Sequence, residues 1–287
     1  MSAAPRWYVP SALWSSASRA HLRWNLRLSR ADQADRKGRT FEYVHPLAGR
    51  FVYHPAGFLS RRIFLYDTFE RAELEFAVEQ ARRGGTILDV GANIGLYTAA
   101  CAHAAGEHGH VIALEPAPAT FAKLTETCRR LHLDNVTVLP IAAARERGVA
   151  MLAIKPADDA RQHLVDARGH ESAIEIPTER LDDLTDPDTV TLMKIDVEGH
   201  EVQVIEGAPR IMANGRARLI VEFFPAGQAA AGASVSQLWD LLSRTHRCVA
   251  IVRNDGSVMP DPTGLDGLDA PDDETIWNTL WLPADLR

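Results

Sequence analysis

The sequence is poor in cysteine: its 287 residues include only Cys101, Cys128 and Cys248, which are widely spaced and form no CxxC pair. That scarcity argues against a disulfide framework or a structural zinc site, and it fits a reducing compartment. No apolar run approaches the roughly 18 residues that a membrane span needs. Arginines also interrupt the apolar core that an N-terminal signal peptide would require. We therefore expect a cytoplasmic protein without a transmembrane segment.

An excess of positive charge is also lacking, since the formal net charge is −7 at pH 7. Such a chain has no general attraction to a polyanion, so nucleic acid is a poor first guess as a substrate or partner. The hydrophobic content of 46% and the charged content of 24% are those of an ordinary globular protein. The length allows one large domain or a core domain with a cap.

The N-terminal segment, residues 1–65, is expected to form a helical and hairpin cap on a second domain of residues 66–287. Apolar residues recur at roughly helical spacing after Ser11, a plausible N-cap, and arginines interleave with them: Leu13, Ala17, Ala20, Trp24 and Leu28. This helix could touch a membrane surface or an acidic partner. The interpretation we favour is a cap helix that packs on the core or on a second subunit. The segment Phe41–Tyr53 then predicts a hairpin.

The most informative segment is Thr86–Tyr97, which reads TILDVGANIGLY. An apolar run gives way to glycines and then to a helix-compatible stretch, which predicts a first parallel strand, a tight turn and a helix start. In open α/β sheets, nucleotide-like ligands bind at such strand ends. Gly91 and Gly95 would let the backbone approach a ligand without a Cβ in the way. The spacing is D-x-G-x-N-x-G, which differs from the G-x-G-x-x-G of dinucleotide-binding proteins.

Strands and helices alternate beyond this turn, which predicts an α/β fold with a mainly parallel sheet and helices on both faces. The expected later strands are 111–114, 136–139, 191–195, 218–222, 248–252 and 276–282. The expected helices are 67–83, 119–131, 201–212 and 236–243. Residues 151–176 predict a mobile loop or an irregular hairpin, and residues 255–274 a surface loop. Because no helix separates the final two strands, the last one is expected to run antiparallel.

The ordered motifs identify the family that this chain resembles. They are Phe69-Glu70, Asp89–Gly95, Ala113–Pro116, Leu181–Leu184, Lys194–Glu201 and Val221-Glu222. In this order they resemble the FkbM family of S-adenosylmethionine-dependent methyltransferases. The resemblance implies a class I, Rossmann-like methyltransferase fold with a seven-stranded sheet and S-adenosylmethionine as the cofactor. The family often has a histidine shortly after the acidic residue of the fifth strand, whereas this chain has Glu222-Phe-Phe-Pro225.

Several residues become candidates for cofactor binding. Glu115 ends the second strand, where a carboxylate can accept hydrogen bonds from both ribose hydroxyls. Asp89 and the backbone around Gly91 would face the methionine part, although Asp89 could instead brace the turn. Asn93, near Gly95, would contact the cofactor, cap the next helix, or do both.

Two further positions would complete the cofactor site. Glu70 would close over the methionine end from the preceding helix, unless it is a solvated helix-start residue. Ala142 would lie beside the adenine and contribute backbone groups. A sulfonium cofactor needs an anion near its ribose and polar groups for its zwitterion, and these positions would supply both.

The candidate catalytic residues are Asp196, His200 and Glu222. Asp196 ends the fourth strand, next to the expected methyl group, and could accept or orient the proton of an acceptor. His200 follows a turn at Gly199 and is the simplest candidate base, because histidine ordinarily titrates near neutrality. Asp196 and Glu222 could converge on one acceptor and even hold Mg²⁺, but we assign no metal.

Other polar residues near these motifs have simpler expected roles. Glu201 is expected to begin a helix, where negative charge favours the dipole. Lys194 should lie in a strand environment or pair with an acid. His163 and His170 could reach the acceptor if their segment is a lid.

The sequence therefore predicts a methyltransferase that acts on a small-molecule acceptor. The resemblance favours a hydroxyl oxygen of a sugar or natural product, and nitrogen or carboxylate acceptors stay open. A nicotinamide-dependent oxidoreductase and a non-catalytic binding protein with the same fold are the rival hypotheses. A homodimer is one assembly that the sequence leaves open.

Overall fold

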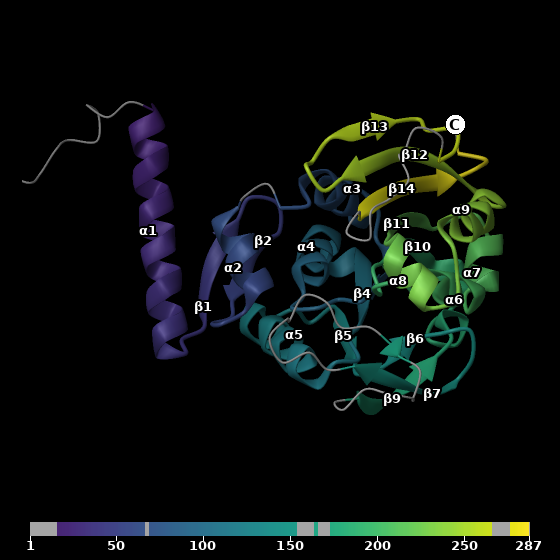
Figure 1. Ribbon diagram of the computed structural model, residues 1–287, viewed down its shortest axis with the longest axis horizontal. Coiled ribbons are helices and arrows are strands. Elements are labelled where there is room, and N and C mark those ends of the chain that lie inside the picture. The colour runs from purple at the N-terminus through teal and green to yellow at the C-terminus, as the bar shows by residue number, and fades with distance from the viewer. Residues whose placement is uncertain (1–15, 67–68, 154–163, 166–172, 266–275, 287) are drawn as a thin grey trace, which may run out of the picture.

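A computed structural model describes residues 16–66, 69–153, 164–165, 173–265 and 276–286. Its centre is an eight-stranded sheet in the order β13-β12-β14-β11-β10-β3-β4-β5 (Figure 1). The strands are β3 (Gly85–Val90), β4 (Gly109–Leu114), β5 (Val136–Leu139), β10 (Val190–Ile195), β11 (Arg218–Phe223), β12 (His246–Arg253), β13 (Val258–Pro260) and β14 (Trp277–Pro283). Each strand predicted from the apolar runs is present.

The pairing directions match those of a class I methyltransferase sheet. The strands β5, β4, β3, β10 and β11 pair in parallel. The last strand, β14, inserts antiparallel between β11 and β12, which confirms the predicted reversal. The eighth strand, β13, pairs antiparallel with the edge strand β12. It lies in a segment predicted to be a loop, so the prediction was wrong for these three residues.

Helices cover both faces of the sheet, and each face has its own apolar core (Figure 1). The helices α3 (Arg71–Ala81), α4 (Leu96–Ala105) and α5 (Pro118–Leu131) lie on one face. The helices α6 (Glu201–Glu206), α7 (Pro209–Ala213) and α9 (Val235–Ser243) pack on the other. A short helix, α8 (Pro225–Ala230), follows β11, and 3₁₀ turns occur at η2 (Gly106–His108), η3 (Leu181–Asp183) and η4 (Pro187–Thr189).

The single helix predicted over residues 201–212 is in fact two helices, α6 and α7. The break follows Gly207, where a Cβ would lie 2.1 Å from the Ala144 carbonyl oxygen. Pro209 then starts α7, because a proline lacks the N–H that a continuous helix would need. The signal for this break was present in the sequence.

The cap consists of α1 (Ser16–Lys37), the hairpin β1 (Phe41–His45) and β2 (Gly49–Tyr53), and α2 (Phe58–Leu65). Figure 1 shows α1 on the outer side of this unit. Two arginines of α1 lie over aromatic rings of the cap, Arg27 over Phe64 at 5.8 Å and Arg30 over Phe41 at 3.8 Å. These contacts fit the favoured interpretation of α1 as a packed cap helix.

The cap shares the core of the sheet domain as well. Phe51, Val52 and Ile63 are fully buried in the same cluster as Leu74 of α3 and Ile87 of β3. The division of the chain at residue 66 stays a prediction. Ser11, the expected N-cap of the first helix, lies outside the described residues. Among the described residues, no helix combines the length and hydropathy that crossing a bilayer requires.

A second sheet forms from the segment after β5. It has the order β6-β9-β7-β8, with β6 (Ala142–Ala143), β7 (Gly148–Ala153), β8 (Leu164–Val165) and β9 (Ala173–Glu179). The antiparallel pairing of β7 with β9 matches the irregular hairpin that was one of the two predictions for this region. His163 and His170 lie outside the described residues.

Candidate active site

A cavity of about 1360 Å³ opens at the carboxyl ends of the parallel strands, the edge where open α/β sheets bind ligands. Most of the candidate site residues line it: Glu70, Gly91, Asn93, Glu115, Ala142, Asp196, His200 and Glu222. Asp89 and Gly95 are candidates that do not line it. The topology therefore gathers into one cavity residues that are up to 152 positions apart in the sequence (222 − 70).

The glycine turn after β3 is packed against the end of β10. Gly91 has a φ of +80°, and a Cβ there would lie 1.8 Å from the Asp196 carbonyl oxygen. Gly95 has a φ of +92°, and its Cβ would lie 2.7 Å from Leu124 Cδ1 of α5. Both positions thus require glycine for chain packing. Gly91 also borders the cavity, as expected from a turn that admits a ligand close to its backbone.

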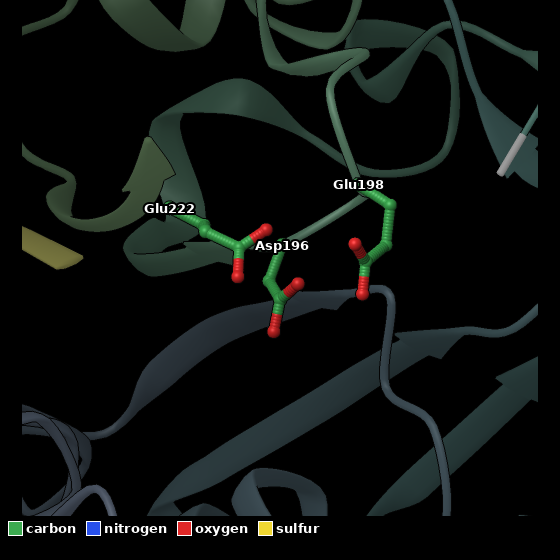
Figure 2. A group of neighbouring side chains, drawn as sticks. All are labelled: Asp196, Glu198 and Glu222. Carbon is green, nitrogen blue, oxygen red and sulfur yellow. The ribbon is translucent and has the colours of Figure 1, made fainter. Parts of the chain in front are cut away.

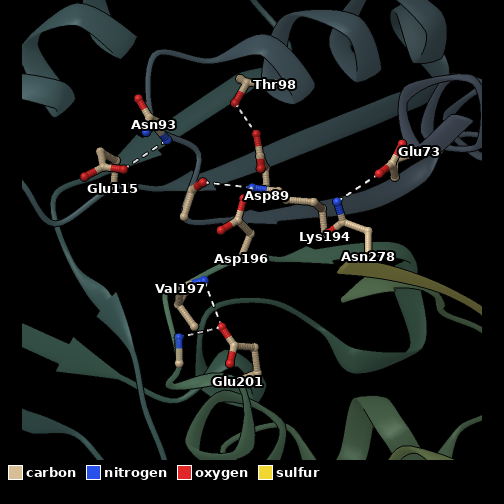
Figure 3. Close-up of polar contacts among 12 residues, drawn as sticks. Glu73, Asp89, Asn93, Thr98, Glu115, Lys194, Asp196, Val197, Glu201 and Asn278 are labelled. Atoms are coloured by element: carbon tan, nitrogen blue, oxygen red, sulfur yellow. Dashed lines mark hydrogen bonds and ion pairs between the residues drawn. The ribbon is translucent and has the colours of Figure 1, made fainter. Parts of the chain in front are cut away.

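Glu115 is fixed by backbone donors on both sides. Its Oε2 accepts from the Asn93 N–H at 2.9 Å (Figure 3). Its Oε1 accepts from the Ala117 N–H, also at 2.9 Å. Burial raises the pKa of Glu115 to about 7, against the lowering effect of these two bonds. Asn93 has a left-handed φ of +50°. The N-cap of α4 is Gly95, without a side-chain capping bond, so Asn93 is not the cap of that helix.

Asp89 lies behind the cavity wall, with 2% of its surface exposed. It accepts a hydrogen bond of 2.5 Å from the Thr98 hydroxyl of α4. Burial raises its pKa, and Lys194 and Thr98 counteract that effect. This geometry is that of a carboxylate that braces the turn, which was one of the two predicted roles.

Lys194 connects the glycine turn to the candidate catalytic strand end. Its Nζ donates to the Gly91 carbonyl at 3.0 Å and pairs with Asp196 Oδ2 at 2.9 Å (Figure 3). The ammonium also lies 5.2 Å from the centre of the Tyr97 ring. Burial alone would lower the pKa of Lys194, but the carboxylates around it, Asp196 first, raise it. The prediction that Lys194 pairs with an acid is confirmed.

Glu70 approaches this lysine from the start of α3. It adopts a left-handed φ of +45° and hydrogen-bonds to Tyr97. Burial, and then the nearby charges of Asp196 and Glu73, raise the pKa of Glu70 to about 7. Glu70 is therefore part of the wall rather than a solvated helix-start residue.

Three carboxylates meet on one side of the cavity (Figure 2). Oxygen atoms of Asp196, Glu198 and Glu222 all lie within 4.8 Å of one another, so the predicted convergence of Asp196 and Glu222 is present. Glu222 is 8% exposed, and its Oε2 has no hydrogen-bond partner among the described residues. Burial, and then repulsion from Asp196 and Glu198, raise the pKa of Glu222 well above its usual range.

The loop that carries Asp196 and Glu198 is held by Glu201. Its Oε1 accepts from the Val197 and Gly199 N–H groups at 3.2 and 3.0 Å. Gly199 makes the predicted sharp turn with a φ of +109°, and His200 follows as the N-cap of α6 at the cavity edge. Glu201 does begin α6, as predicted, but its fully buried carboxylate also shapes the loop.

Sequence reasoning missed Glu198 and Tyr97. Glu198 has a left-handed φ of +55°, a strained conformation that in non-glycine residues clusters at functional sites. Its only sequence signal was its place in the Lys194–Glu201 motif. Tyr97 follows the glycine turn, and no polar pattern distinguishes it there from an ordinary helix residue.

A family model supplies the decisive comparison. The model of the methyltransferase FkbM domain matches residues 89–249, which is just over half of the chain. The chain belongs to the FkbM methyltransferase family. The family identified from the sequence motifs is thereby confirmed.

Relatives of known name agree with this family. The chain is 29% identical over 140 residues to the hexuronic acid methyltransferase AglP of Haloferax volcanii. That match covers 48% of this chain and 56% of AglP, so the chain spans just over half the length of that curated relative.

Solved structures include two similar methyltransferases. The methyltransferase FkbM of Methylobacillus flagellatus is 16% identical, with a TM-score of 0.45 over 89% of this chain and 59% of that one. An O-methyltransferase of Thermotoga maritima is 14% identical, with a TM-score of 0.40 over 74% and 66% of the two chains. The fold assignment rests on the strand order above, independently of these two scores.

Proposed function

We propose that this protein transfers the methyl group of S-adenosylmethionine to a hydroxyl oxygen of a sugar or natural-product small molecule. The observation that carries the proposal is the group of carboxylates, Asp196, Glu198 and Glu222, in the cavity that the glycine turn also lines. A hydroxyl acceptor needs such groups to take up its proton and orient it. The similarity to a protein named for hexuronic acid supports a sugar acceptor.

The residues at the glycine turn fit the cofactor. Glu115 has a carboxylate at the cavity wall whose lone pairs can accept from ribose hydroxyls in addition to its two backbone donors. Gly91 leaves the backbone open to a ligand, and Ala142 on β6, which also lines the cavity, would offer a small side chain beside the adenine. Glu70 would face the methionine end. When bound, the cofactor supplies an electrophilic methyl group on a sulfonium.

The carboxylates divide the proton chemistry between them. Lys194 fixes the Asp196 side chain through their 2.9 Å contact. From there Asp196 would accept the proton of the acceptor hydroxyl while the methyl–sulfur bond breaks, the C–O bond forms and S-adenosylhomocysteine leaves. Burial and the neighbouring carboxylates raise the pKa of Glu222, which favours its protonated form, and in that form it can donate a hydrogen bond that orients the same oxygen. His200 is the second candidate for the base.

An acceptor that carries both an amine and hydroxyl groups tests whether the methyl group is transferred to oxygen or to nitrogen. We would incubate the protein with isotopically methyl-labelled S-adenosylmethionine and methyl β-D-glucosaminide, next to methyl β-D-glucoside. Proton–carbon NMR then distinguishes a methoxy from an N-methyl product. We expect methoxy products from both sugars. An N-methyl product from the glucosaminide alone would assign the activity to nitrogen acceptors instead.

A further inference from the structure

The cavity is larger than its cofactor-facing residues require. Its volume of about 1360 Å³ exceeds the roughly 300–1,000 Å³ of a typical pocket for one small ligand. The additional wall comes from the cap and from the turn between β12 and β13, through Phe58, Arg62 and Tyr66 on one side and Arg253 on the other. A second ligand, the acceptor, therefore has its own surface in this cavity.

Aromatic rings form part of the cap wall without being buried. Phe58 is 61% exposed and Tyr66 is 51% exposed, although both line the cavity. The Tyr66 ring lies 5.3 Å from the Trp24 ring of α1, which holds it in place. Exposed rings in a cavity wall offer flat apolar faces, on which the C–H face of a sugar ring can pack.

Arg62 differs from two other arginines that line the cavity, Arg61 and Arg71. Arg61 pairs with Asp32 and Asp35 of α1, and Arg71 pairs with Glu75. These contacts neutralise the charges of Arg61 and Arg71 within the protein.

Arg62 has no carboxylate partner among the residues that the structure describes. Its guanidinium lies 5.1 Å from the centre of the Phe69 ring, and the side chain is exposed. Ring contact of this kind leaves the N–H groups of a guanidinium available. Two of them in one plane match the two oxygens of a carboxylate or phosphate.

The part of the cavity wall that the cap forms is close, in sequence and in space, to Glu70, which interacts with Asp196 of the carboxylate cluster. The Phe69 N–H donates to the Tyr66 carbonyl at 3.1 Å, and Glu70 is the next residue after Phe69. Glu70 in turn interacts with Tyr97 and with the charges of Lys194 and Asp196. A sugar that packs on the cap wall can therefore place one of its hydroxyls at Asp196.

We propose that Arg62 binds an anionic group on the sugar acceptor, a carboxylate or a phosphate, while Phe58 and Tyr66 pack on the sugar ring. Arg62 thereby becomes the residue that selects acidic sugars over neutral ones. The inference rests on the proposed function, because it places the acceptor in the same cavity. This inference adds the class of substrate and the residues that recognise it.

Calorimetric titration tests this with full-length protein saturated with S-adenosylhomocysteine. The probes are methyl β-D-glucuronide, glucose 1-phosphate and neutral methyl β-D-glucoside. We expect at least one anionic sugar to bind about tenfold tighter than the glucoside, because a hydrogen-bonded ion pair is worth at least that ratio. The tighter of the two anionic sugars identifies the anion.

Variants test whether Arg62 is the residue responsible for the preference for anionic sugars. Arg62→Gln should reduce the anion preference to less than about threefold, and Arg62→Lys should keep part of it because one charge remains. Arg71→Gln is the matched control, since Arg71 lines the same wall but is paired with Glu75, and it should keep the full preference. Phe58→Ala should weaken the binding of all three sugars by similar factors.

The proposal would be overturned by equal binding of all three sugars, or by an anion preference that survives in Arg62→Gln. Absence of binding by every sugar to the loaded protein would also overturn it. A failure of S-adenosylhomocysteine itself to bind, measured in a separate titration, would instead count against the proposed function.

Discussion

Replacing Asp196 by asparagine tests the proton chemistry most sharply. The variant keeps the size of the side chain but removes the group that would accept the hydroxyl proton. Loss of a positioned base typically lowers a rate by about 10²–10⁴-fold, which corresponds to roughly 3–5 kcal/mol of barrier. We expect the turnover number of Asp196→Asn to fall by this amount, while the Kd for S-adenosylmethionine changes by less than about fivefold, because the proposed role of Asp196 is toward the acceptor and not toward the cofactor.

The structure also predicts a cost in stability. Lys194 has 8% of its side chain exposed, and in the variant it keeps the Gly91 carbonyl but loses the Asp196 carboxylate. Loss of a hydrogen bond by a buried charged group costs about 1–3 kcal/mol, which urea unfolding can measure. Adding Lys194→Met to Asp196→Asn should recover part of this stability without recovering turnover.

The assay is steady-state methyl transfer, followed by S-adenosylhomocysteine formation at saturating cofactor. A turnover number within about threefold of the unmodified protein would remove Asp196 from the proton-transfer role. His200→Gln would then be the variant expected to lose the rate. Equal losses of turnover in the Asp196 and His200 variants would indicate that both residues take part in proton transfer. The pH profile of each variant would then separate their contributions.

Three further predictions concern the cofactor side and the charge balance of the site. Cofactor affinity should weaken as the pH falls below about 7, because protonated Glu115 can no longer accept hydrogen bonds from both ribose hydroxyls. The Glu115→Gln variant should bind the cofactor more weakly, and a calorimetric pH series should show that its affinity no longer depends on pH in this range. Gly91→Ala should lower the free energy of unfolding by more than about 3 kcal/mol, since its Cβ would meet the Asp196 carbonyl, whereas Gly215→Ala, with a φ of +62° and open space, should cost only about 1–2 kcal/mol. Dialysis against EDTA should leave methyl transfer within about twofold, because Lys194 already supplies a positive charge beside Asp196, and a loss restored by Mg²⁺ would refute this.

The parallel sheet could be predicted well because its central strands are buried on both faces. Such strands are nearly continuous apolar runs, and the fifth, predicted over residues 218–222, spans Arg218–Phe223 in the structure. The glycine turn could also be predicted from the sequence, since the positive φ and close packing at Gly91 exclude any side chain there. Those signals are local in the sequence.

The details of the site depend on contacts between distant segments, which no local pattern encodes. Glu201 was expected at a helix start, but its hydrogen bonds to the Val197 and Gly199 N–H groups exist only because the loop folds back over the helix. The role of Glu198 follows from its left-handed backbone and its distance to Glu222. The eighth strand, β13, forms only because β12 offers an open edge.

A crystal structure with bound S-adenosylhomocysteine tests the central claim most directly. We predict that both ribose hydroxyls lie within hydrogen-bond distance of the Glu115 carboxylate, with the sulfur atom directed toward Asp196. A ligand bound elsewhere, or a ribose with no contact to Glu115 while the sulfur points away from Asp196, would contradict the account.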